Sequence, residues 1–204
     1  MNNPTVLKPI GRITSVDMLR GIAALMVCIF HFTNGNKNYL ASGHWFRNFG
    51  SYGWAGVEIF FIISGFIIPY SLNQSKYTYQ NWKDFLIKRI SRIEPPYFIT
   101  ILLILALNYV STLSPYFKGK DLPIDYFNLA LHIGYLNSFF DHPWLNPVFW
   151  TLAIEFQFYL LMALIFPLLI HSSTYVRATI VFAYLLSMFF FSSKFIFYYS
   201  AYFL

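Results

Sequence analysis

The sequence predicts an all-α membrane protein: a polytopic transmembrane helical bundle of about six spans plus the start of a seventh. Only 11% of the 204 residues are charged and 57% are hydrophobic, whereas a soluble domain usually carries about a quarter charged residues. Several apolar runs approach the roughly 20 residues that a helix needs to cross a bilayer. The basic residues lie in short segments between these runs, as in loops that set membrane topology. The lipid bilayer is therefore an expected partner, and nucleic acid is not.

The first predicted span covers about residues 16–33. It carries Arg20 near its start and His31 near its end, eleven positions or about 16 Å apart along a helix, so the two side chains share nearly one face. An ionisable residue in a membrane-length apolar run is costly and is read as functional by default. We predict that His31 is a buried acid/base group and that Arg20 binds an anion on the same helix.

Plainer interpretations of these residues stay open at this point. His31 could instead hydrogen-bond a neighbouring helix or lie near lipid headgroups. Asp17 lies one helical turn before Arg20, and the two charges could neutralise each other at the membrane interface. Such neutralisation would not exclude anion binding.

The second predicted span, about Trp54–Leu72, places Glu58 inside an apolar run, where a carboxylate calls for a partner. Ser64 and Gly65 are small and allow a neighbouring helix to approach closely. Residues 34–53 before this span are interpreted as a loop.

Residues 73–94 form the most basic stretch of the chain, which is typical of the cytoplasmic side. Within it, Trp82–Ile90 alternates as an amphipathic helix would and could lie along the membrane surface. Pro95 and Pro96 are predicted to form the first turn of the third span, about Tyr97–Thr112, because proline fits that position.

The cations Lys88, Arg89 and Arg92 of this stretch have two interpretations. They could bind a phosphate-bearing cofactor that arrives from the cytoplasm. They could also be the topology signal itself, or contact anionic lipid, and the residues alone favour this second interpretation. The N-terminus is basic as well, with Lys8 and Arg12, so we predict that it is cytoplasmic.

Later apolar runs predict further segments: Tyr126–Phe140 as a tilted span or re-entrant element, Val148–Ile170 as the fifth span, Tyr175–Phe191 as the sixth, and Phe195–Leu204 as the start of a seventh. Within the fifth span, Glu155 shares a helix face with Thr151 and Tyr159. Glu155 could orient a histidine, pair with an arginine or be a proton site.

The remaining histidines, His44, His132, His142 and His171, lie near loops or span ends and are interpreted as bystanders. They and His31 do not show the spacing of metal ligands, so no metal site is expected.

Four segments, in order and spacing, resemble the acyltransferase-3 family of membrane acyltransferases, which includes O-acetylases of lipopolysaccharide, peptidoglycan and other polysaccharides. The segments are Ser-Val-Asp-Met-Leu-Arg20-Gly with His31, Gly56-Val-Glu58-Ile-Phe-Phe-Ile-Ile-Ser-Gly-Phe, Lys88-Arg89-Ile-Ser-Arg92-Ile-Glu-Pro-Pro-Tyr, and Pro147-Val-Phe-Trp150-Thr-Leu-Ala-Ile-Glu155-Phe-Gln-Phe-Tyr159. One such motif would be weak, whereas four in order are specific.

The resemblance implies a reaction in which an acyl group, usually acetyl from acetyl-coenzyme A (acetyl-CoA), passes from the cytoplasmic side to a hydroxyl of a glycan or other cell-envelope acceptor. It implies a location in a bacterial inner (plasma) membrane. The implied roles are a catalytic base for His31 with Arg20 as its partner, coenzyme binding for Lys88, Arg89 and Arg92, an acid of open role for Glu155, and substrate contacts for Glu58, Trp150 and Tyr159.

Two departures from the family pattern are visible. The family more often has aspartate where this chain has Glu58. Relatives usually continue through several more spans, whereas this sequence ends inside an apolar run. We therefore expect residues 1–204 to be a single membrane acyltransferase domain that looks truncated at its C-terminus, as a truncated gene product, a fragment or half of a split protein.

Two other functions stay in view. A membrane transport or binding protein could use His31, Glu58 and Glu155 as a relay or translocation path. An inactive, truncated remnant of the acyltransferase would keep only a structural role.

Overall fold

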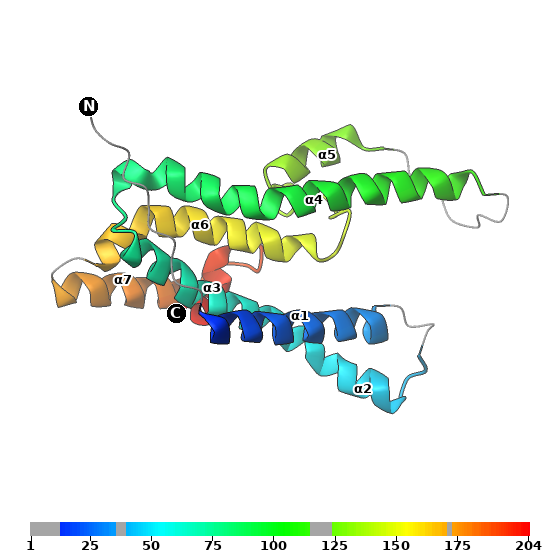
Figure 1. Ribbon diagram of the computed structural model, residues 1–204, viewed down its shortest axis with the longest axis horizontal. Helices are drawn as coiled ribbons and strands as arrows, with labels where there is room; N and C mark the ends of the chain where they lie inside the picture. The colour runs from blue at the N-terminus through cyan, green and yellow to red at the C-terminus, as the bar shows by residue number, and fades with distance from the viewer. Residues whose placement is uncertain (1–12, 36–39, 115–123, 171–172) are drawn as a thin grey trace. The chain divides into compact units, whose positions relative to one another are not determined.

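The computed structural model describes residues 13–35, 40–114, 124–170 and 173–204, and within these ranges every regular element is a helix (Figure 1). Four helical segments are long and apolar enough to cross a membrane: Thr14–Asn34, Trp45–Gln74, Tyr79–Thr112 and Phe149–Leu169. The all-α membrane class is therefore confirmed, while the predicted count of about six spans is not.

Three predicted spans match single helices. These are α1 (Thr14–Asn34), α3 (Ala55–Gln74) and α6 (Phe149–Leu169). Each is an uninterrupted apolar run, so its length and hydropathy alone indicate where it begins and ends.

The predicted loop over residues 34–53 contains a helix that the sequence did not indicate. Helix α2 (Trp45–Ser51) is followed by one 3₁₀ turn, η1 (Tyr52–Trp54), that leads into α3. His44 caps α2, because its ring Nδ1 accepts a hydrogen bond of 3.2 Å from the backbone N–H of Phe46. This cap gives His44 a local structural role.

The prediction for the basic stretch was wrong in one respect. A short turn, η2 (Tyr79–Asn81), leads into a single helix, α4 (Trp82–Thr112), so the amphipathic piece and the third span form one rod of about 46 Å. Pro95 and Pro96 lie inside this helix and not at its first turn. They have no backbone N–H, so the carbonyls of Ser91 and Arg92 lack the donor four residues ahead.

Four short elements complete the fold: α5 (Tyr126–Ile133), α7 (Thr174–Ser187), η3 (Ile196–Tyr199) and α8 (Ser200–Phe203). With eight residues, α5 is about 12 Å long, too short to cross about 30 Å of hydrocarbon. Helix α7 is apolar but has only 14 residues.

The chain divides into two compact units. The first comprises residues 1–77, 166–192 and 197–204, and the second comprises residues 78–165 and 193–196. Among the described residues, the first unit holds α1, α2, α3, α7 and α8, while the second holds α4, α5 and most of α6.

In the first unit, α1 packs closely against α2, η1 and α3 (Figure 1). Gly50, Gly53 and Gly56 lie every third residue on the side that meets α1. A Cβ atom at Gly53 would overlap the backbone carbonyl of Met26, so only glycine permits this approach. The small residues therefore set the distance between the first two apolar segments.

In the second unit, α4 and α6 pack side by side through aromatic rings. Tyr97 and Phe149 have ring centroids 4.6 Å apart, and Phe85 and Tyr159 have centroids 6.5 Å apart. The residue nearer the start of α4 thus meets the residue nearer the end of α6, so the two helices are antiparallel. Residues 193–196 join this unit through the side chain of Gln157, which donates to the Lys194 carbonyl and accepts from the Ile196 N–H.

The N-terminal cations Lys8 and Arg12 and the histidine His171 lie outside the described residues. The orientation that Lys8 and Arg12 helped to predict is not tested by the fold.

Candidate active site

Helix α1 presents Arg20 and His31 on one face, three turns apart, as the helical period predicts. The two residues are therefore not in contact with each other. Arg20 is half-buried, but His31 is exposed and its ring packs only edge-on against Phe30, with centroids 5.4 Å apart. The prediction that His31 is buried was wrong for the part of the chain that the structure describes.

The packing of α1 explains this exposure. The buried residues of α1 are Ala23 and Thr33, and a Cβ atom at Gly50 would fall on the Thr33 side chain. On a helical wheel His31 lies about 120° from the centre of this packed face. The glycine-lined contact therefore turns the Arg20–His31 face away from α2 and α3.

Glu58, which lies in an apolar helix, interacts with a polar side chain of the same unit. Its carboxylate interacts with the hydroxyl of Tyr202, which belongs to α8 in the same unit. The small residue Gly65, two turns along α3, allows the backbone of Phe203 to come into contact. Helix α8 is therefore seated directly on α3, beside Glu58.

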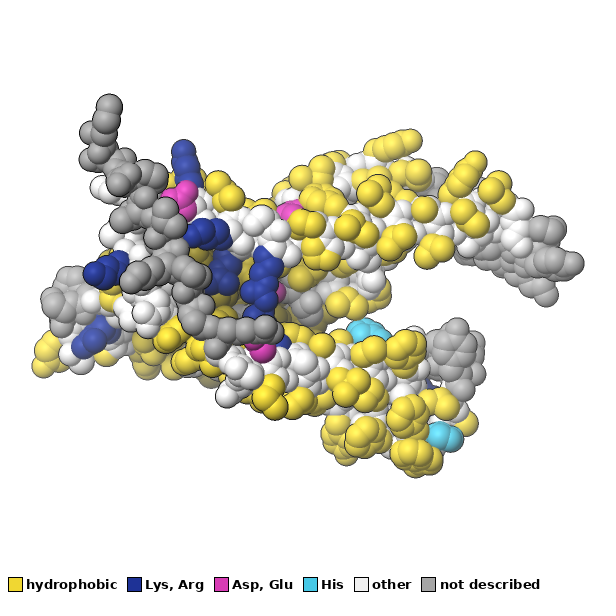
Figure 2. All heavy atoms as spheres, in the orientation of Figure 1, with side chains coloured by type: hydrophobic (Ala, Val, Ile, Leu, Met, Phe, Trp, Pro, Cys, Tyr) yellow, Lys and Arg dark blue, Asp and Glu magenta, His cyan; other side chains and the backbone are white. Residues whose placement is uncertain are grey.

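The three predicted coenzyme-binding cations all project from the first half of α4. Lys and Arg side chains gather over this half, whereas hydrophobic side chains cover the second half (Figure 2). Arg89 is half-buried with its guanidinium 5.7 Å from the ring centroid of Phe85, while Lys88 and Arg92 are exposed. Arg89 is thus the most firmly positioned of the three.

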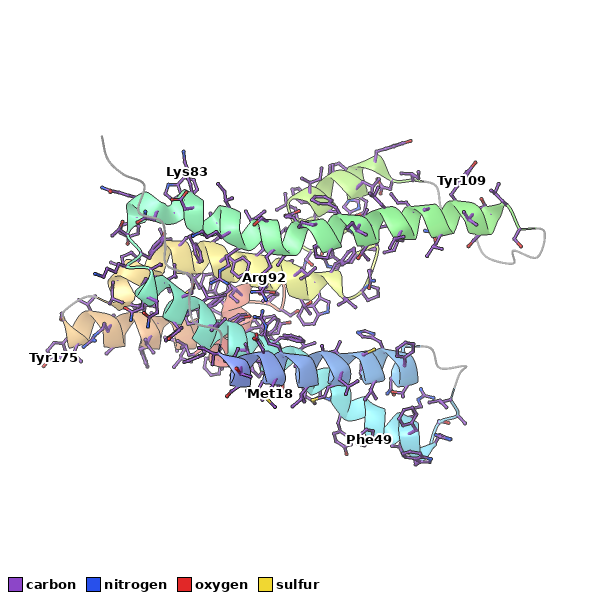
Figure 3. The ribbon with its side chains drawn as sticks, viewed as in Figure 1. Met18, Phe49, Lys83, Arg92, Tyr109 and Tyr175 are labelled. Atoms are coloured by element: carbon purple, nitrogen blue, oxygen red, sulfur yellow. The ribbon has the colours of Figure 1, made fainter. Side chains whose placement is uncertain are left out.

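Arg92 and Lys83 leave α4 on opposite sides (Figure 3). Nine residues at about 100° each turn the helix by two and a half revolutions, which puts these two side chains about 180° apart. Lys88 and Arg89 lie within about 60° of Arg92 on the same wheel. The three cations therefore make one face, and Lys83 does not belong to it.

Next to this cationic face lies the hydrogen-bonded pair Glu155 and Tyr159. The Tyr159 hydroxyl donates to Glu155 Oε1 over 2.5 Å, and Tyr159 is only 2% exposed. The positive charges of Arg89 and Arg92 act on the same hydroxyl. A partly buried carboxyl–hydroxyl pair thus lies within electrostatic range of two guanidinium groups in the second unit.

Trp150, the third predicted residue of α6, is half-buried at the start of that helix, two and a half turns before Tyr159. The second unit therefore holds Lys88, Arg89 and Arg92 on α4 and Trp150, Glu155 and Tyr159 on α6, while the first unit holds Arg20, His31 and Glu58.

His132 was interpreted as a bystander, but it lies fully buried at the centre of a polar network. The backbone N–H of Leu145 donates to its Nε2 at 3.2 Å, so the ring proton is on Nδ1, which donates to the Asn128 carbonyl at 2.8 Å. Asn137 donates to the side chain of Asn128 at 2.5 Å. Burial lowers the pKa of His132, and the bond to the Asn128 backbone opposes this only partly.

Sequence reasoning also missed Glu94 and Tyr135. Tyr135 is 2% exposed, and its hydroxyl and Glu94 Oε2 are both buried beside each other. The two groups interact electrostatically, and the negative charge of Glu94 adds to burial in raising the pKa of Tyr135. A helical period carried through Pro95 would have placed Glu94 one turn before the buried Tyr97.

In the described ranges no three His, Cys, Asp or Glu side chains converge as a metal site would require. The absence of a metal from the reaction stays a prediction.

Comparison with known proteins identifies the family. Residues 13–204 match the family model described as an acyltransferase domain. The chain belongs to this acyltransferase family. The resemblance drawn from the four motifs is thereby confirmed, and the membrane helices fit it.

The relatives of this acyltransferase chain are named for O-acetylation. It is similar to O-acetyltransferase OatA of Staphylococcus aureus strains NCTC 8325, COL and MRSA252, with 27% identity over 165 residues in each case. The matched region is 76% of this chain and 25% of each relative, so the chain spans about a quarter of the length of the curated relatives it matches. No solved structure matches the chain.

Proposed function

We propose that this chain is, or is part of, a membrane O-acetyltransferase that moves an acetyl group from acetyl-CoA to a hydroxyl of a glycan or other cell-envelope acceptor. The observation that carries the proposal is that the charges of Arg89 and Arg92 act on the partly buried Glu155–Tyr159 hydrogen bond between two apolar helices. Ionisable groups are kept in such helices where function requires them, and the family match supports acyl transfer as that function.

The donor would be held at the cationic face of α4. Coenzyme A carries several phosphate groups, and arginine forms paired, charge-assisted hydrogen bonds to phosphate. Arg89 and Arg92 would supply these bonds, and Lys88 would add charge without a fixed geometry. The cytoplasmic position predicted for this positive stretch would suit a donor that is made in the cytoplasm.

The chemical step would use His31 as general base. Its imidazole takes the proton of the acceptor hydroxyl while the hydroxyl oxygen attacks the thioester carbonyl, and the coenzyme leaves as a thiol after receiving a proton. The imidazole of His31 makes no hydrogen bond to the described residues and the residue is exposed, so both ring nitrogens are available for this role. Arg20, on the same face, would stabilise negative charge.

The remaining assignments complete the proposal. Glu58, Trp150 and Tyr159 would contact the acceptor, and Glu155 would hold the Tyr159 hydroxyl in place through their hydrogen bond. The chain would act as one membrane acyltransferase domain in a bacterial inner membrane, with its N-terminus in the cytoplasm.

The test is an acyl-transfer assay on the full chain in lipid vesicles, with radiolabelled acetyl-CoA as donor and a soluble tetrasaccharide of N-acetylglucosamine as acceptor probe. Label in the saccharide that is lost in the His31→Ala variant supports the proposal. Saccharide or proton movement across the vesicle membrane without transfer of label would instead favour a transporter. Absence of both transfer and coenzyme binding would favour a remnant.

A further inference from the structure

Helix α2 and the turn η1 expose an aromatic face that no described element covers. Trp45, Phe49 and Tyr52 follow one another at i, i+4 and i+7, so they lie on one side of the helix. These three side chains, the aromatic face, are 72%, 61% and 74% exposed. Among the described elements α2 packs only against α1 and η1, and hydrophobic side chains gather over it (Figure 2). An apolar surface of this kind marks a site of contact with a partner.

Another side of α2 is fixed against the end of α1. A Cβ atom at Gly50 would fall on the Thr33 side chain, and the Asn34 side chain donates to the Arg47 carbonyl at 3.2 Å. On a helical wheel the aromatic face lies about 130° from Gly50. Helix α2 is thus held beside the last turn of α1 with its aromatic face turned away from that contact.

The lengths of the helices place α2 at a boundary of the bilayer. Helix α3 has 20 residues, or about 30 Å, which equals the thickness of the hydrocarbon. The residues of α2 and η1 precede it and add about 15 Å to the same helical segment. Helix α1 is also about one hydrocarbon thickness long and ends beside α2. Helix α2 therefore lies where both apolar helices leave the hydrocarbon.

The composition of this segment fits the boundary and neither side of it. Trp and Tyr are enriched at membrane interfaces, because each combines an apolar ring with a polar N–H or O–H group. Arg47 and Asn48 of the same helix would be costly in hydrocarbon. Residues 35–57 contain Lys37 and Arg47 but no Asp or Glu, so no carboxylate in them repels the phosphates of lipid headgroups.

We propose that α2 lies in the membrane interface with its aromatic face inserted between phospholipid headgroups and acyl chains. The boundary is the one opposite Lys76, which follows the far end of α3. Because α2 is fixed to the end of α1, the lipid contact sets the depth of that end and of His31, one turn before it. The inference does not depend on acyl transfer and holds for a transporter or a remnant as well.

The test measures the depth of a nitroxide spin label in the full chain, in vesicles of phosphatidylethanolamine and phosphatidylglycerol. Cys28→Ser removes the lone cysteine, and the label is then attached to Phe49→Cys. Phe66→Cys is the matched control, because Phe66 is 55% exposed and lies near the middle of α3. Collisions of the label with oxygen and with a water-soluble nickel chelate give its depth, calibrated with lipids labelled at known positions.

We expect the label at residue 49 to lie about 5–10 Å below the headgroup surface, and the label at residue 66 to lie much deeper. A label at residue 49 that meets the nickel chelate as freely as in water overturns the proposal. So does a label at residue 49 as deep as the one at residue 66.

Other partners of the aromatic face would give different results. A saccharide site would leave the label in water and shield it from nickel when the N-acetylglucosamine tetrasaccharide is added. A second copy of the chain would broaden the spectrum through spin–spin coupling that disappears on dilution with unlabelled chain. Either result in place of immersion in lipid contradicts the proposal.

The effect on the depth of α1 has its own test. A label on Phe32→Cys, which is exposed next to His31, reports the depth of the end of α1. Changing all three residues of the aromatic face to serine should move this label toward water by at least about 3 Å, two residues along a helix, with an unchanged circular dichroism spectrum. An unmoved label with an unchanged spectrum would show that the aromatic face does not set this depth.

Discussion

Replacing both Arg89 and Arg92 by alanine is expected to weaken coenzyme binding far more than it slows catalysis at saturating donor. The two guanidinium groups lie on one face of α4 beside the Glu155–Tyr159 pair. In the proposed function they contact phosphates and not the reacting carbonyl. Their loss should therefore raise KM for acetyl-CoA with little change in kcat.

The magnitude follows from how each side chain is placed. Arg89 is half-buried and braced on the Phe85 ring, and a hydrogen bond from a charged, partly desolvated group contributes about 1.5–3 kcal/mol. Arg92 is exposed, so its contribution is screened and is about 1 kcal/mol or less. Together they give about 3 kcal/mol, or roughly a hundredfold loss in affinity at 1.4 kcal/mol per factor of ten.

The assay is equilibrium binding of labelled coenzyme A to the chain in vesicles, with Lys83→Ala as matched control. Lys83 is an exposed cation on the same helix but on the opposite side (Figure 3), so its loss changes net charge without changing the proposed phosphate site. The reasoning is refuted if the double variant binds coenzyme A as tightly as wild type, or if Lys83→Ala weakens binding equally.

Three further predictions concern the fold and its polar groups. Gly50→Ala should lower the free energy of unfolding by about 1–3 kcal/mol, because the added methyl group overlaps α1. Gly21→Ala has open space around it and should raise the free energy of unfolding by up to about 1 kcal/mol. Equal thermal unfolding temperatures for the two variants would contradict this prediction. Tyr159→Phe leaves Glu155 without its donor and should cost about 1–3 kcal/mol of stability together with most acyl transfer; a variant as stable and active as wild type would count against the pair. Burial lowers the pKa of His132 in the folded chain, so the unfolded chain binds a proton at this residue more readily than the folded chain does. The free energy of unfolding should therefore be highest above pH about 6.5 and should fall below it, by at most about 1.4 kcal/mol per pH unit. Urea unfolding at several pH values should show this slope in wild type and not in His132→Gln.

Long apolar runs let the sequence predict α1, α3 and α6, because hydropathy stays high along each helix and carries α3 past Pro69 and α6 past Pro167. Helix α4 shows where that reasoning fails. The buried residues Leu86, Ile93, Tyr97 and Ile101 recur at helical spacing across the proline pair, so the packed stripe continues and outweighs two lost backbone hydrogen bonds. A Pro-Pro pair read alone could not reveal this balance.

The candidate site was predictable only in part. Helical periodicity indicated that Arg20 and His31 share a face, but it could not indicate which face of α1 packs against other helices. The contact with the three glycines uses a different face, which leaves His31 exposed. The i+4 spacing of Glu155 and Tyr159 indicated that they share a helix face, but their hydrogen bond was not predicted. Tyr135 left no signal, because its position depends on a left-handed backbone in an irregular segment.

His132 carried a signal that went unused. It follows Asn128 by four residues and precedes Asn137 by five, which is the spacing of a helical turn leading into a cap. Polar residues at such spacing in an otherwise apolar segment are compatible with a buried hydrogen-bonded network as well as with the end of a membrane span.

The central claim is that the imidazole of His31 performs the chemical step, and the most direct measurement is acetyl transfer by His31→Gln in vesicles. His31 is exposed and its imidazole makes no hydrogen bond to the described residues, so this substitution should leave the unfolding temperature and coenzyme binding unchanged. We predict that transfer falls by about 10²–10⁴-fold, while His142→Gln transfers as wild type does. Transfer by His31→Gln at the wild-type rate would contradict the account.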